Sequence, residues 1–182
     1  MIHLPKDLLI TILADLDLSV LGKICQSSLH LNRICNDKQL WVTKYQNEFG
    51  ETFPWVYSNY EMNLYLTKKQ DQLCNQLKQG YIDLLYEYAD ADSVTILNNL
   101  DISDAHVTNL FENYTGINQL RYKVDGFLME NKIKMSGQLL TQNNLYDLYP
   151  YTTDYNTFIT RLNQIVLNYI RIVNAITTYF TS

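Results

Sequence analysis

The chain has 182 residues, of which 47% are hydrophobic and 18% charged, and its formal net charge is −5. This length suffices for one ordinary domain or for a small module joined to a larger one, and the apolar share excludes a chain that is disordered by composition. The acidic balance and the lack of a run of lysine and arginine argue against binding to nucleic acid or to anionic membranes, because both need clustered cations.

Three cysteines, Cys25, Cys35 and Cys74, occur without a Cys-x-x-Cys pair. This odd number predicts free thiols in a reducing compartment. The first residues lack the basic and apolar regions of a secretory leader. We therefore expect a cytoplasmic protein.

The spacing of apolar residues predicts an all-α protein, because helical periods recur and no stretch sustains a strand-like alternation. In the first helix, expected to begin at Pro5, apolar residues occupy positions 4, 8, 9, 12, 13 and 16. Ser19 is the predicted cap of the second helix, and Gly50 the predicted end of the fourth. The expected bounds of the second to fourth helices are about 19–29, 31–35 and 40–49.

The rest of the chain also has helical spacing. A connector over residues 51–59 contains Pro54 and marks the expected boundary between two domains. Gly80 is a predicted break in the helix that follows the connector, and Ser103 is a predicted cap. The helices expected after the connector cover about 60–89, 92–100, 103–114, 117–131, 136–148 and 154–181.

The last of these helices has the most regular period. Its apolar residues at 158, 162, 165, 169, 172, 176 and 179 are spaced alternately by four and three. A stripe this broad predicts a helix at the centre of the C-terminal core. The alternative is a coiled-coil seam with a second copy of the chain.

Side chains that carry chemistry lie far apart in the sequence. His3, His30 and His106 have no partner at metal-ligand spacing, and the six glycines are too far apart to form a phosphate-binding loop. Acidic residues concentrate near predicted helix starts, where they favour the helix dipole. We therefore expect no catalytic residue, no metal and no cofactor.

Residues 4–41 hold more large apolar side chains than three short helices can cover. Modules below about 40 residues rarely build a sufficient core without a metal, a disulfide or a partner. Part of this surface must therefore be buried against the rest of the chain or against another protein.

Residues 4–41 resemble an F-box, whose pattern opens with Leu-Pro, an acid with two leucines, an apolar pair and Leu-Asp. It continues with a leucine-rich second helix and closes on Arg-apolar, an aspartate and Leu-Trp. The matching residues are Leu4-Pro5, Asp7-Leu8-Leu9, Ile12-Leu13, Leu16-Asp17, Leu21, Ile24, Arg33-Ile34, Asp37 and Leu40-Trp41. Near these positions the family usually has an apolar residue, then Cys or Ser, then Trp, where this chain has Ser27, Ser28 and Leu31. The chain therefore departs from the family pattern at Ser27 and at Leu31.

The resemblance implies an F-box-like domain at residues 1–50 that binds a Skp-family adaptor, and through it a cullin scaffold of a ubiquitin ligase. Residues 51–182 would then be a helical domain that binds an unidentified target protein, and the chain itself would not be an enzyme. If the chain comes from a pathogen, it would act in the host cytoplasm or nucleus. The residues expected at the adaptor face or in its immediate support are Leu4, Pro5, Leu8, Ile12, Leu13, Leu21, Ile24, Leu40 and Trp41.

An alternative function does not involve ubiquitin. The chain would then be a helical interaction or structural protein, with the last helix joining two copies in a homodimer. Adaptor binding by the purified chain separates the two interpretations.

Overall fold

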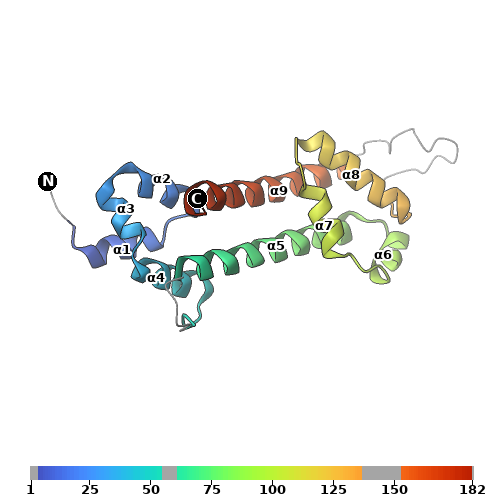
Figure 1. Ribbon diagram of the computed structural model, residues 1–182. Helices are drawn as coiled ribbons and strands as arrows, with labels where there is room; N and C mark the ends of the chain where they lie inside the picture. Colours follow the sequence, from blue (N-terminus) through green and yellow to red (C-terminus); the bar gives the residue numbers. More distant parts are fainter. Residues whose placement is uncertain (1–3, 55–60, 137–152, 182) are drawn as a thin grey trace. The chain divides into compact units, whose positions relative to one another are not determined.

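A computed structural model describes residues 4–54, 61–136 and 153–181. Within these ranges the chain forms helices and no strand, which confirms the all-α prediction (Figure 1). The helices are α1 (Lys6–Ala14), α2 (Leu18–Ser27), α3 (Leu29–Cys35), α4 (Lys38–Phe49), α5 (Glu61–Tyr88), α6 (Ala91–Asn98), α7 (Asp104–Phe111), α8 (Ile117–Glu130) and α9 (Thr153–Phe180). The helix expected over residues 136–148 lies almost wholly outside the described residues.

The chain divides into two compact units. The first unit contains Met1–Leu73 together with Ile170–Ser182, and the second contains Cys74–Tyr169. The first unit thus takes in more of the chain than the predicted module of residues 1–50. Among the described residues, no helix has the length and apolar character needed to cross a membrane.

Local residues at the helix ends set the bounds of the short N-terminal helices. Pro5 precedes the first residue of α1, and the side chain of Asp17 accepts a hydrogen bond from the Ser19 amide at 2.9 Å. The prediction that Ser19 caps α2 is therefore wrong, because the carboxylate two residues earlier takes that role. Ser28 caps α3, whereas Gly50 ends α4 with a φ of 66°, as predicted.

The core of the first unit is built around Trp41 of α4. Its ring lies 5.5 Å from that of Tyr65 in α5 and 5.3 Å from that of Phe180 in α9, measured between centroids. Its indole Nε1 donates a hydrogen bond to the carbonyl oxygen of Cys35 at 2.8 Å. The first turns of α5 and the last turns of α9 therefore complete a core that the N-terminal helices begin.

Tyr179 of α9 packs directly over Gly22 of α2. A Cβ atom at Gly22 would lie 2.3 Å from Cδ2 of the Tyr179 ring and 2.7 Å from its Cβ. We expect Gly22→Ala to lower the free energy of unfolding by about 1–3 kcal/mol, because the ring must move out of its packed position. Urea unfolding followed by circular dichroism measures the loss.

Two further variants test this explanation. Gly126→Ala in α8 adds the same methyl group where no atom lies within 4 Å, and we expect no loss there. Adding Tyr179→Ala to Gly22→Ala removes the clash, so the two effects should combine to less than their sum. If the stability losses of the two single variants added up exactly in the double variant, the proposed clash between the methyl group added at position 22 and the Tyr179 ring would be contradicted.

Cys25 and Cys35 form a disulfide, with their Cα atoms 5.7 Å apart. The prediction that both are free thiols is wrong. The single residue Ser28 separates α2 from α3, so the apolar faces of the two helices meet in one core and bring both buried cysteines together. Cys74 is a free thiol, as predicted, but it is exposed and does not lie on an apolar helix face as expected. The odd number of cysteines therefore no longer supports the expected cytoplasmic location, because that argument assumed that all three thiols are free.

The second unit is built on α5 and α9 as well as α6–α8. Helix α5 continues through Gly80 without interruption, so the predicted break there is wrong. A Cβ atom at Gly80 would lie 3.0 Å from Cδ1 of Ile165, which shows that the glycine permits a close approach between α5 and α9. Ser103 caps α7 as predicted, since its hydroxyl oxygen accepts from the His106 amide.

Most of the apolar stripe of α9 is buried within the chain. The fully or nearly fully buried members of this helix are Tyr155, Phe158, Ile159, Leu162, Val166, Ile172, Ala175, Ile176 and Phe180. This burial is what a helix at the centre of the core requires. None of the seven stripe residues of α9 is an exposed side chain. A homodimer through this helix would need such exposed residues for contact with a second copy.

Candidate partner-binding surface

Helix α1 presents apolar side chains to solvent on the face turned away from the core. Leu4, just before the helix, is 43% exposed, and Leu8 and Ile12 are 46% and 45% exposed. Leu8 and Ile12 are four residues apart and therefore lie in one row along the helix, and Leu4 precedes them by the same interval. We call these three residues the α1 stripe. Covering the exposed half of such a side chain stabilises a complex by about 1 kcal/mol, roughly half of the value for full burial.

The opposite face of α1 lies in the core. Ile10, Leu13 and Ala14 are buried, and α1 packs against α3 and α4. The stripe therefore belongs to a helix that is already anchored on its other side.

The predicted partner residues divide between surface and interior. Leu4, Pro5, Leu8 and Ile12 are exposed, Ile24 is half-buried, and Leu13, Leu21, Leu40 and Trp41 are at most 4% exposed. The last four are core residues that support the surface and do not form it. Contact of the exposed residues with an adaptor stays a prediction.

In helices α1–α4, two further exposed large apolar residues lie outside the set of predicted contacts. Val20 of α2 is 45% exposed, and Leu29, the first residue of α3, is 82% exposed. Periodicity did not identify Leu29, because the start of α3 depends on the Ser28 cap.

A hollow of about 230 Å³ lies beside the stripe, between α1 and α3. We call it the α1–α3 hollow; it is lined by Leu4, Lys6, Leu9, His30, Arg33, Ile34 and Asp37. Lys6 and Asp37 form an ion pair across it. Their hydrogen bond raises the pKa of Lys6 and lowers that of Asp37, because each stabilises the charged form of the other.

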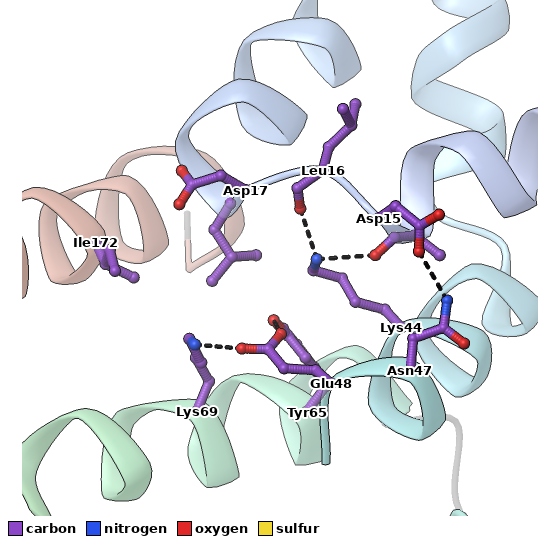
Figure 2. Close-up of a pocket in the computed structure, with 11 residues that line it drawn as sticks. Asp15, Leu16, Asp17, Lys44, Asn47, Glu48, Tyr65, Lys69 and Ile172 are labelled. Atoms are coloured by element: carbon purple, nitrogen blue, oxygen red, sulfur yellow. Dashed lines mark hydrogen bonds and ion pairs between the residues drawn. The ribbon is translucent and has the colours of Figure 1, made fainter. Parts of the chain in front are cut away.

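A second hollow of about 360 Å³ lies beside the turn between α1 and α2 and is lined largely by charged and polar side chains (Figure 2). Lys44 of α4 is only 4% exposed, and its ammonium donates hydrogen bonds to the carbonyl oxygens of Ala14 at 3.1 Å and Leu16 at 2.6 Å. Burial lowers the pKa of Lys44. The last carbonyls of a helix lack partners within the helix, so Lys44 holds the end of α1 in place and with it the α1 stripe.

The remaining polar groups of this second hollow also pair within the chain. Glu48 accepts a hydrogen bond from the Tyr65 hydroxyl at 2.5 Å and forms an ion pair with Lys69, and Asn47 donates to Asp15 at 2.9 Å (Figure 2). Burial, followed by the bond to Glu48, raises the pKa of Tyr65. These contacts fasten α4 to α5 and to the α1–α2 turn, and they give the second hollow a structural role.

Asp17 connects the α1–α2 turn to α9. Its carboxylate accepts hydrogen bonds from Ser19 and from Arg171, whose guanidinium lies 3.0 Å away. Partial burial opposes ionisation, but these hydrogen bonds outweigh it and lower the pKa of Asp17 from 3.8 to about 2.

This lowered pKa predicts a dependence of stability on pH. A carboxyl group with a depressed pKa in the folded state stabilises the fold above its unfolded pKa, and that contribution disappears as the pH falls from about 4 to about 2. We expect Asp17→Asn to lower the melting temperature at pH 6, with a difference from wild type that shrinks through this window. Asparagine retains the capping oxygen, so the comparison isolates the charge. Thermal melts of the exposed-site variant Asp71→Asn provide the control, and a difference that stayed constant with pH would contradict the assignment.

Among the residues that the structure describes, no group of three or more His, Cys, Asp or Glu side chains could hold a metal ion. His106 instead packs in an aromatic cluster of the second unit, stacked on Phe127 with centroids 4.0 Å apart. Burial lowers the pKa of His106.

Comparison with known protein families gives a match for the N-terminal part of the chain. Residues 1–47 match the family model described as F-box-like, and this range contains α1, α2, α3, most of α4 and the α1 stripe. No curated protein and no solved structure matches the chain. An F-box-like domain indicates an adaptor-type component that binds a Skp-family adaptor, and the region after residue 47 has no family assignment.

Proposed function

Residues 1–47 form an F-box-like domain, and from this premise we propose that the chain is the substrate-recognition subunit of a ubiquitin ligase of the Skp-cullin-F-box type. The α1 stripe is the observation that carries the proposal. It offers two exposed apolar side chains on a helix whose other face is fixed in the core, with a third, Leu4, just before the helix.

In this role the chain catalyses no bond change. The F-box-like domain binds the adaptor, the adaptor joins a cullin scaffold, and the helices after residue 47 hold a target protein. The gain is one of proximity, because a tethered target reaches the ubiquitin-conjugating enzyme at a high effective concentration. We propose the cytoplasm as the site of action, or the host cytoplasm or nucleus if the chain comes from a pathogen.

Co-expression of the full chain with a Skp-family adaptor, followed by gel filtration, tests the proposal. We expect the two proteins to elute together, and addition of the cullin scaffold to shift both to a larger complex. Elution of the chain apart from the adaptor, either alone or as a homodimer, would contradict the proposal and favour a helical protein without a link to ubiquitin.

A further inference from the structure

The α1–α3 hollow continues the α1 stripe toward α3. Leu4 belongs to both, so a partner lying along the stripe passes the hollow. Leu4, Leu9 and Ile34 give the hollow an apolar lining, in which Ile34 is buried and Leu4 is accessible. Its volume of about 230 Å³ is below the roughly 300–1,000 Å³ that small-molecule sites enclose. The hollow is therefore too small for a typical small-molecule ligand and large enough for one side chain of a protein partner.

The polar lining of the hollow has an excess of positive charge. The charge of Lys6 is balanced by Asp37 in their ion pair. Arg33, which also lines the hollow, is exposed and has no ion pair with any residue that the structure describes. The site is therefore cationic in a chain whose net charge is −5.

We propose that the α1–α3 hollow receives an apolar side chain of the Skp-family adaptor, and that a neighbouring carboxylate of the adaptor pairs with Arg33. The inference rests on the proposed function and assigns a second element to the same interface. A guanidinium suits this task because it holds a carboxylate through two parallel hydrogen bonds. Complementary charge beside an apolar anchor raises the association rate and selects one register of binding along the stripe.

The test measures the dissociation constant of the purified adaptor with the full wild-type chain and with Arg33→Glu. We expect Arg33→Glu to weaken binding by about tenfold or more, because two carboxylates would then face each other. Arg33→Gln, which removes the charge without reversing it, should give a smaller loss. Raising the salt concentration should weaken wild-type binding more steeply than binding by Arg33→Gln, since screening acts on the pair that only wild type forms.

Lys23→Glu is the matched control. Lys23 is exposed on α2 outside the hollow, so its replacement changes the net charge by the same amount. We expect less than a twofold change in affinity for this variant. Equal affinities for Arg33→Glu and Lys23→Glu, with wild type binding normally, would overturn the assignment of the hollow and leave the proposed function intact. Absence of binding by wild type itself would instead refute the proposed function and, with it, this inference.

Discussion

Replacement of both Leu8 and Ile12 by aspartate is expected to abolish binding to a Skp-family adaptor. The two side chains form most of the α1 stripe and are about half exposed in the free chain. Covering the exposed half of each side chain contributes about 1 kcal/mol, and a carboxylate in its place would have to be desolvated in the interface at a further cost. The combined loss exceeds a hundredfold in affinity, since about 1.4 kcal/mol corresponds to a factor of ten. Gel filtration with the adaptor and a titration of the purified proteins measure it.

The fold should survive these changes, because both side chains point to solvent. The double variant Met129→Asp with Leu167→Asp is the matched control, since these residues lie outside the F-box-like domain and are 40% and 46% exposed. We expect it to bind the adaptor as wild type does. Retained binding by the Leu8 and Ile12 variant, with an unchanged circular dichroism spectrum, would show that the stripe is not the adaptor surface.

Removal of residues 170–182 is expected to unfold the F-box-like domain, although these residues lie far from it in sequence. The deleted segment supplies Ile172, Ile176 and Phe180 to the core of the first unit. Three buried side chains contribute roughly 5–9 kcal/mol in total, which is comparable with the 5–15 kcal/mol that stabilises a whole domain. The shortened chain should therefore lose cooperative unfolding and adaptor binding together.

A single substitution tests the same dependence more gently. Phe180→Ala removes the ring that packs at 5.3 Å from Trp41, and we expect it to lower the free energy of unfolding by about 3–5 kcal/mol. Thr178→Ala on the exposed side of α9 should change it by less than about 0.5 kcal/mol. Urea unfolding read from Trp41 fluorescence, in a Trp55→Phe background, measures both. Equal free energies of unfolding for Phe180→Ala and Thr178→Ala would refute the role of α9 in this core.

The periodic parts of the fold were predictable from sequence. Helices α5 and α9 each span 28 residues with regular apolar spacing, and their expected bounds agree with the structure to within one residue at each end. The cap at Ser103 and the glycine stop at Gly50 follow from local chemistry, which the sequence states directly.

The errors arose where distant or ambiguous contacts decide the structure. Gly80 has the appearance of a helix breaker, but its role depends on Ile165 in another helix. The cysteine pair depends on how α2 and α3 pack, which spacing alone does not give. At the α1–α2 turn, Asp17 and Ser19 are both good caps, and only the geometry selects Asp17.

The partner surface was predictable only in part. Helix α1 carries apolar residues on two rows, and periodicity cannot tell which row faces the core. The structure buries Ile10 and Leu13 and leaves Leu8 and Ile12 exposed. Trp41 was predicted at or near the adaptor face, whereas it lies in a core completed by Phe180 from the far end of the chain.

The heat-capacity change on binding tests the central claim most directly. Titration calorimetry of the purified chain with a Skp-family adaptor, at several temperatures, measures this quantity together with the stoichiometry. Burial of the α1 stripe predicts saturable one-to-one binding with a negative heat-capacity change, the sign that accompanies the removal of apolar surface from water. Absence of saturable binding, or binding whose heat-capacity change is zero or positive, would contradict the claim that the adaptor covers the stripe.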